Sequence, residues 1–373
     1  MGVVVFLLGA LVGGVVGLVL AVTLEDRAKE WMRRRARLRR SRAIERLAVT
    51  GLGAVSIGRV RTSVHIVEGD GHALLEPRNI IVKLSTSPAE LPPLVARLKD
   101  MWFRRLSAKP DNSGELVAPW NSDSMVSLKS YTISRTSLEE DSTLSVEASV
   151  SDYGTFAATV LSLDEPIATV EVDGRECSTT LRQEYFPTDD KVATAVEKPI
   201  PFLSNGLGVM LLAFTDDRQV ILVRRKMESR ARPGERDVSV VEGLHAMSDR
   251  GPYGEIDIID TAVRGCREEL GIDVSREDVH ILALGVDMRY YQWNFMGLVD
   301  ARCRAAEVLE MYNLHAKDRW EGKLEPIKAD AFQVLDRLRR DGCWDLGLVT
   351  TYLAFCYRYG VRDTQRAAKR VFG

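Results

Sequence analysis

The sequence lacks paired cysteines. Its five cysteines stand singly, without a C-x-x-C pair, at Cys177, Cys266, Cys303, Cys343 and Cys356. Such spacing indicates neither a zinc site nor a disulfide framework. Buried free thiols are the simpler interpretation.

Two common catalytic patterns are also missing. The chain has no G-x-x-x-x-G-K-[ST] phosphate loop and no G-x-S-x-G nucleophile elbow. The "GLG" that begins at Gly206 precedes an expected strand rather than a helix, so it does not support a dinucleotide-binding turn. These absences argue against the chemistries that depend on those motifs.

Charge is absent from one long stretch near the N-terminus. Residues Val3 to Leu24, "VVVFLLGALVGGVVGLVLAVTL", contain no charged side chain, and about 20 such residues are enough for a membrane-spanning helix. A cleaved signal peptide would have a basic region before a shorter apolar core, and neither is present. We expect a transmembrane helix at residues 3–24.

Positive charge is concentrated directly after this span. From Arg27 to Arg46 there are ten Lys and Arg residues, against only Glu30 and Glu45. The positive-inside rule places such a segment in the cytoplasm, which predicts a single-pass membrane protein with most of its chain cytoplasmic. A nucleic-acid-binding arm is the alternative interpretation. Topology and attraction to anionic lipid explain the run without nucleic acid, which we do not expect as a partner.

Small residues recur every four positions within the span. Gly9, Gly13, Gly17 and Ala21 would lie on one face of a helix, where small side chains let two helices approach closely. The pattern favours a homodimer in the membrane. Glycine is common in transmembrane helices for other reasons, which is the competing explanation.

The remaining chain is long enough for two domains, since it forms most of a 373-residue sequence that is 45% hydrophobic and 28% charged. We expect a basic juxtamembrane segment and linker at residues 25–64 and a β-rich companion domain at residues 65–200. In the latter, "NIIVKL", "SMVSLKSYTIS" and "STLSVEASVS" are typical of strands and "SPAELPPLVARLKDMWFRRL" of a helix. This domain would pack on or gate the next one.

The second domain is expected at residues 201–360, followed by a tail at residues 361–373. Two apolar runs, "GLGVMLLAFT" and "QVILVRRK", are joined by "DDR" and predict a hairpin. A strand through "RDVSVVEG", a helix, strands near residues 280–287 and 292–301, and two final helices follow. This order favours an α/β or α+β layered fold.

A pair of adjacent carboxylates, Glu268 and Glu269, lies near the end of the expected helix. Arg264 stands one turn before Glu268, where the two can interact, and Gly271 suits a C-terminal cap. Taken alone, such a pair is typical of an exposed acidic helix end.

The wider context resembles the Nudix hydrolase superfamily. The family's box is G-x5-E-x7-R-E-U-x-E-E-x-G-U, where U is aliphatic, and "RGCREELGI" from Arg264 to Ile272 is similar to its second half. The preceding hairpin, its "RRK" end and the "VEG" strand end also resemble the family. The resemblance covers roughly residues 205–360. In layout, the chain further resembles membrane-tethered Nudix-like proteins of bacterial cyclic-oligonucleotide antiphage systems.

The resemblance implies an α/β/α sandwich that hydrolyses the diphosphate of a nucleoside diphosphate derivative. It implies that Glu268, Glu269 and Gly243 hold Mg²⁺, or Mn²⁺ in its place, and that Arg264 orients the glutamates. Mg²⁺ prefers hard oxygen ligands and can bridge to a pyrophosphate, so the chemistry is consistent. His245 and the cations at residues 224–226 are further candidates for phosphate contact, although ordinary solvated loop and strand-end positions explain them as well.

The chain departs from the family where the box has glutamate directly after arginine. Gly265 stands there, and glycine inside a helix costs about 1 kcal/mol relative to alanine. Either another carboxylate replaces the missing one, or the site binds a nucleotide without cleaving it. The candidate replacements are Glu242, Glu255, Glu321 and Glu325, with Glu321 preferred. The alternative function is a nucleotide-sensing module that signals to its membrane helix, and a third is a structural adaptor without metal.

Overall fold

The computed structural model describes residues 53–85, 87–107, 125–135, 141–172, 175–227, 232–251, 253–317 and 322–373. The expected transmembrane helix, its glycines and Glu321 lie outside these residues. Within the described part of the chain, no helix is long and apolar enough to cross a membrane.

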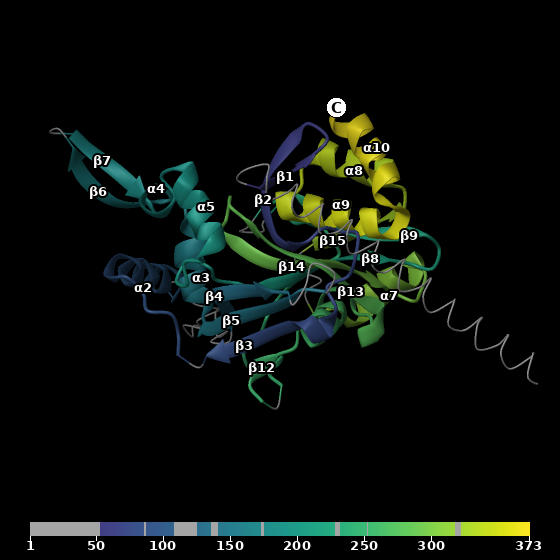
Figure 1. Ribbon diagram of the computed structural model, residues 1–373, viewed down its shortest axis with the longest axis horizontal. Coiled ribbons are helices and arrows are strands. Elements are labelled where there is room, and N and C mark those ends of the chain that lie inside the picture. The colour runs from purple at the N-terminus through teal and green to yellow at the C-terminus, as the bar shows by residue number, and fades with distance from the viewer. Residues whose placement is uncertain are drawn as a thin grey trace, which may run out of the picture.

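The described residues form a large mixed sheet, a smaller sheet and a projecting hairpin (Figure 1). The large sheet contains β1 (Ala54–Ile57), β2 (Val60–Gly69), β8 (Gly208–Phe214), β9 (Gln219–Arg225), β10 (Arg236–Asp237), β11 (Val240–Gly243), β13 (Val279–Asp287), β14 (Gln292–Asp300) and β15 (Gly322–Lys328). The smaller sheet contains β3 (Ile80–Ser85), β4 (Met125–Ser134), β5 (Thr143–Ser151) and β12 (Glu255–Ile256). The hairpin pairs β6 (Pro166–Val172) with β7 (Arg175–Thr180).

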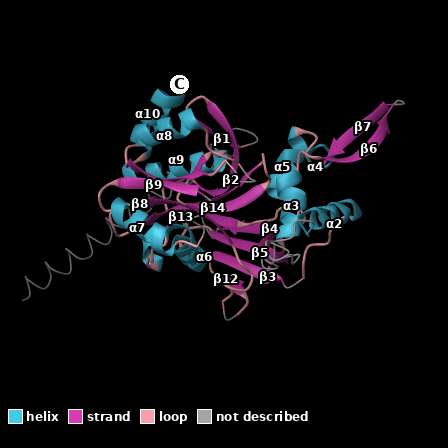
Figure 2. Cartoon of the chain, turned by 180° about the vertical axis from the view of Figure 1, so that it is seen from behind, coloured by secondary structure: helices cyan, strands magenta, loops and turns pink. Residues whose placement is uncertain are grey.

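Helices surround both sheets (Figure 2). Those of the first half are α2 (Pro93–Ser107), α3 (Tyr153–Thr159), α4 (Leu181–Tyr185) and α5 (Asp189–Glu197). Those of the second half are α6 (Ile258–Gly265), α7 (Ala305–His315), α8 (Ala331–Asp341), α9 (Asp345–Tyr359) and α10 (Val361–Phe372). The prediction of a mixed α and β fold is confirmed.

Strand β8 shows why the large sheet lies between two helical layers. All of its residues are buried, and successive side chains point to opposite faces. Val209, Leu211 and Ala213 join one hydrophobic cluster, which includes side chains of α6 and α7. Met210, Leu212 and Phe214 join another with side chains of α8, α9 and α10. The sheet is therefore covered on both faces.

The predicted hairpin is present, since β8 and β9 pair antiparallel. Strand β8 also runs parallel to β14, which lies beside it in the sheet. The single strand expected through "RDVSVVEG" is instead divided, because β10 pairs with β9 and β11 pairs with β8.

Several elements differ from expectation. Residues 54–64, expected as part of a linker, contain β1 and the start of β2, and β2 pairs with β13 of the large sheet. The expected tail at residues 361–373 forms α10, whose Ala367, Ala368 and Val371 are buried. Helix α7 and strand β15 were not predicted. Strand β15 is fixed by pairing with β9, and α7 packs mainly against residues 266–270, so neither depends on a strong local pattern.

A buried polar cluster connects β2, β13 and α9. Asp287 is fully buried and accepts hydrogen bonds from Trp344 Nε1 and from the Ser63 hydroxyl. That hydroxyl also lies 2.9 Å from Asp345 Oδ2. A hydroxyl has one proton and donates to one of these carboxylates at a time, while the Ser63 backbone N–H donates to Asp345 Oδ2 at 2.7 Å. Burial, opposed by the hydrogen bonds from Ser63 and Trp344, raises the pKa of Asp287.

Candidate functional site

The site is built on the end of α6, where the helix widens into a π-helical turn at Cys266–Leu270. Asp257 caps the start of the helix through the backbone N–H groups of Ile259 and Asp260. The predicted cap at Gly271 is confirmed, because its φ is +73° and its N–H donates to the Arg267 carbonyl. The buried side of the helix packs on the large sheet, which fixes where its polar residues lie.

Arg264 is the centre of the site. Its Nε and Nη2 each lie 2.8 Å from an oxygen of Asp249, in a two-pronged ion pair. Nη2 also donates to the Gly243 carbonyl at 2.8 Å. Burial would lower the pKa of Arg264, but the hydrogen bonds and charges of Asp249 and Glu242 outweigh burial and raise it. Arg264 is therefore a fixed cation.

The remaining nitrogen of Arg264 contacts two more carboxylates. Nη1 lies 2.8 Å from Glu242 Oε1 and 3.3 Å from Glu268 Oε2. Glu242 comes from β11 and Glu268 from the π-helical turn, so the shared nitrogen joins a strand end to the helix end. The predicted contact between Arg264 and Glu268 is present.

Close packing explains why residue 265 is a glycine. A Cβ at this position would lie 2.7 Å from Glu242 Cβ and 2.8 Å from Val240 Cγ1, closer than real Cβ contacts allow. Strand β11 thus packs directly against the helix backbone. The glutamate expected here is absent, and the Glu242 side chain lies beside the empty position.

Glu268 and Glu269, the adjacent glutamates of the predicted box, contact different partners. Glu269 Oε1 accepts the Val241 N–H at 2.8 Å, which ties the helix to β11. Glu268 Oε1 lies 2.6 Å from Lys317 Nζ, and the Lys317 N–H donates to the Glu268 carbonyl. Partial burial would raise the pKa of Glu268, but Lys317 and Arg264 outweigh it and hold the pKa below its usual value. Glu268 is ionised and neutralised by two cations.

A recess opens beside Glu269, between the ends of β9, β10, β11 and β15 and helix α7. Its polar lining side chains are Arg225, Asp237, Glu269 and Tyr312. The Tyr312 hydroxyl donates to the Gly322 carbonyl at 2.9 Å, which connects α7 to the start of β15. The recess therefore combines a carboxylate of the predicted box with Arg225, one of the cations proposed for phosphate contact.

The other predicted residues have separate roles. His245 Nδ1 lies 3.0 Å from the Ser248 backbone nitrogen and 3.3 Å from that of Met247, so the ring supports its own loop. Burial, with the nearby Arg264, lowers the pKa of His245. Open space surrounds the α-carbon of Gly243, because a Cβ there would meet nothing within 4 Å.

Two candidates for the missing carboxylate lie elsewhere. Glu255 lies on β12, and its Oε1 would be 2.4 Å from a Cβ on Gly251. Glu325 forms a close pair with the buried Arg236, whose Nε lies 2.7 Å from Glu325 Oε2. Of the three candidates that the structure describes, Glu242 is the one that contacts Arg264.

The structure adds two residues that were not predicted. Asp249 is buried and accepts hydrogen bonds from Arg264, from the Thr261 hydroxyl and from the His245 N–H. Lys317 reaches Glu268 from the chain that follows α7. Asp249 lies outside the box pattern aligned on Arg264, so its position in the sequence gives no signal.

The oxygen donors of Glu242, Glu268, Glu269 and the Gly243 carbonyl have the chemistry that Mg²⁺ prefers. Among the described residues, however, no three His, Cys, Asp or Glu side chains are grouped as metal ligands are. The donor types suit the ion, while their arrangement is one of carboxylates paired with Arg264, Lys317 and a backbone N–H.

Comparison with protein-family models finds no match. Comparison with curated proteins finds none either. Among solved structures, the chain is similar to DR0079 from Deinococcus radiodurans, with 16% identity over 41% of this chain and 83% of that chain and a TM-score of 0.28. A score of this size carries no argument about fold or function.

Proposed function

We propose that this chain is a membrane-anchored, cytosol-facing Nudix-like hydrolase that cleaves the diphosphate of a nucleoside diphosphate derivative with Mg²⁺. The observation that carries the proposal is the position of Glu242, beside Gly265 and 2.8 Å from Arg264. Glu242 would replace the carboxylate that Gly265 removes from the box. Its carboxylate shares Arg264 Nη1 with Glu268, so both acids are directed to one place.

The proposed chemistry divides among residues of this site. Glu268, Glu269 and the Gly243 carbonyl would hold Mg²⁺, which when bound would polarise the diphosphate. Glu242 would accept the proton of the attacking water as its oxygen bonds to phosphorus and the bridging P–O bond breaks. Arg264 would keep Glu242 and Glu268 ionised and oriented, because Asp249 fixes the guanidinium from the other side.

A second candidate is a nucleotide-sensing module that binds without cleavage and signals to its membrane helix. The observation that favours it is the neutralisation of Glu268, which is bound by both Lys317 and Arg264. A carboxylate engaged by two cations has less capacity for a metal ion. In this proposal no other residue replaces the carboxylate that is missing at position 265.

Turnover by the full chain in detergent would separate the two. We would incubate it with Mg²⁺ and a panel of nucleoside diphosphate derivatives and cyclic oligonucleotides, beside Glu242→Gln and Glu268→Gln. The matched control is Glu277→Gln, an exposed glutamate in the turn after the box. The hydrolase proposal expects monophosphate or orthophosphate from the parent and the control, and a loss of at least a hundredfold in both site variants.

The other outcomes are equally informative. Nucleotide binding without turnover, together with a change in oligomeric state, would support the sensing module and reject the hydrolase. A parent that neither binds nor cleaves any member of the panel, and whose melting temperature does not respond to millimolar metal, would favour the structural adaptor.

A further inference from the structure

Helix α10 has a row of positive charge on its exposed face. Arg362, Arg366, Lys369 and Arg370 are spaced so that they lie on one side of a helix, and all four are exposed. The opposite side packs against α8 and α9. The apolar side of this helix is therefore already used within the fold, and what it offers to a partner is charge.

The turn between β1 and β2 extends this row. A Cβ on the terminal Gly373 would lie 3.2 Å from Arg59 Cδ, and a Cβ on Gly58 would lie 2.8 Å from Phe372 Cβ. The turn thus lies against the end of α10. We call Arg59 and the four cations of α10 the basic surface.

Few acids neutralise this surface. Asp363 pairs with Arg366 at 2.8 Å, with both side chains exposed. Arg370 lies over the Phe332 ring at 4.4 Å, which orients it without removing its charge. The whole chain has a formal net charge of −2, so the excess of cations is local. Such a surface attracts an anionic partner.

We propose that the basic surface binds the anionic lipid headgroups of a membrane. The covalent path of the chain supports a lipid partner. The juxtamembrane basic run ends at Arg46 and β1 begins at Ala54. Even a fully extended chain between these two residues would be roughly 30 Å long at most. Arg59 lies in the turn between β1 and β2, the first two strands of the described residues. Nucleic acid would be attracted by the same charges, but it would not account for the neighbouring apolar span.

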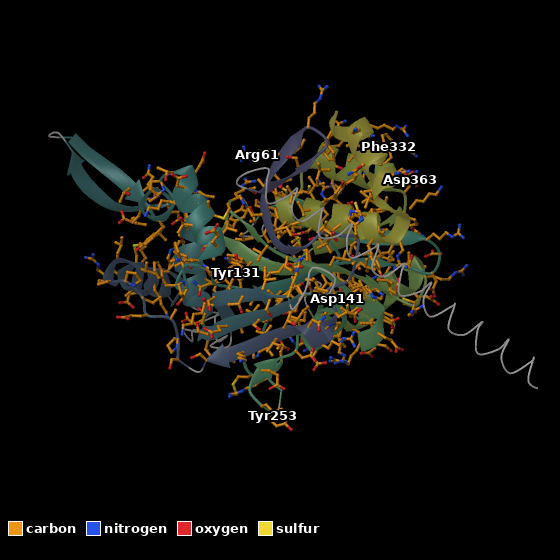
Figure 3. All side chains as sticks on the ribbon, viewed as in Figure 1. Arg61, Tyr131, Asp141, Tyr253, Phe332 and Asp363 are labelled. Atoms are coloured by element: carbon orange, nitrogen blue, oxygen red, sulfur yellow. The ribbon has the colours of Figure 1, made fainter. Side chains whose placement is uncertain are left out.

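Binding through this surface would set the orientation of the candidate site. Phe332 and Asp363 mark the end of the molecule formed by α8 and α10, and Tyr253 lies at the opposite edge (Figure 3). Tyr253 belongs to the loop between β11 and α6 and is 94% exposed. With α10 on the membrane, this loop would face away from the bilayer. The inference goes beyond the proposed function, and its test reads the surface and the membrane anchor separately.

The test uses the full chain in lipid nanodiscs. Lys369 is an exposed amine within the surface, and Lys129, exposed on β4, is an internal reference. We would measure by mass spectrometry how fast a water-soluble amine-reactive ester modifies each lysine in zwitterionic discs and in discs containing phosphatidylglycerol. The site variant is Arg362→Gln with Arg366→Gln and Arg370→Gln, and the control is Arg78→Gln with Arg97→Gln and Lys191→Gln.

We expect anionic discs to slow modification of Lys369 several-fold while leaving Lys129 unchanged. The protection should disappear at about 1 M salt, where the screening length is about 3 Å, and in the site variant, but persist in the control. Equal rates for Lys369 in both kinds of disc would overturn the proposal. So would protection by added nucleic acid in the absence of any effect of anionic lipid.

Anchoring is read separately, as retention of the chain on zwitterionic discs at high salt. A retained chain with unprotected Lys369 would overturn the lipid-binding surface alone. A chain that is released, but whose Lys369 is protected by anionic discs, would overturn the anchor and support the surface.

Discussion

The Glu242 side chain lies beside the backbone of Gly265, so closely that a Cβ on residue 265 would be 2.7 Å from Glu242 Cβ. The carboxylate from the strand and the glycine in the helix are therefore one feature. A side chain at residue 265 would occupy the space that the Glu242 side chain fills.

Gly265→Ala should destabilise the protein, although alanine is the better helix former by about 1 kcal/mol. The added methyl would press on Glu242 and Val240, and overpacking of this kind costs roughly 1–3 kcal/mol. Urea denaturation would measure the change. Gly243→Ala is the control, since a Cβ there meets open space. A more stable Gly265→Ala variant would contradict this packing.

Arg264→Lys should reduce the stability of the protein, because lysine cannot make the two-pronged pair with Asp249. Removing the cation altogether would cost roughly 3–5 kcal/mol, so the lysine variant, which keeps a charge beside Asp249, should lose less than that. Arg267→Lys is the comparison, since its pair with Asp273 is exposed and should matter little. Chemical denaturation of both variants would decide, and equal effects would mean that the Asp249 pair is not special.

Lys317→Gln should increase the response to Mg²⁺, because it releases one oxygen of Glu268 from a competing ammonium. We expect the metal-dependent rise in melting temperature to begin at a several-fold lower Mg²⁺ concentration than in the parent. Lys323→Gln, on the exposed side of β15, removes the same charge without touching Glu268. If the two variants respond alike, Lys317 does not control the site.

Asp287→Asn should change how stability depends on pH. The pKa of Asp287 is raised in the folded protein above its ordinary 3.8, so the folded state holds this proton more tightly than the unfolded state does. The contribution of Asp287 to the free energy of unfolding is therefore complete below the ordinary pKa of 3.8 and is lost as pH rises through the raised pKa of the folded state. The stability of the parent relative to the variant should therefore fall with rising pH. Urea denaturation from about pH 4 to about pH 8 spans the range in which a raised carboxyl pKa titrates. A constant difference would show that Asp287 does not carry the proton.

Local patterns predicted the elements that are determined locally. The β8 and β9 hairpin follows from two apolar runs around a short polar turn, and Gly271 was identified as a cap by its place after the last helical residue. The sequence of β5 was also sufficient to identify a strand, and Leu144, Val146 and Ala148 are buried as apolar residues, although Ser149 and Ser151 are buried too.

What could not be predicted depends on contacts between distant residues. Nothing in residues 54–64 indicates that β2 will pair with β13. Glu242 was only one of four candidate acids until the structure placed it against Gly265. Asp249 and Lys317 contact the site because of the paths of two loops. The spacing of residues in the sequence does not predict the path of a loop.

Strand β12 pairs with β3, with Glu255 opposite Lys83 and Ile256 opposite Val82. The segment that leads from Gly243 to α6 therefore pairs with the smaller sheet directly before the helix that contains Arg264. The two halves of the chain are consequently not interchangeable parts. In evolution, a second half separated from the first by gene fission would leave β3 behind, so we expect the two halves to be inherited as one unit.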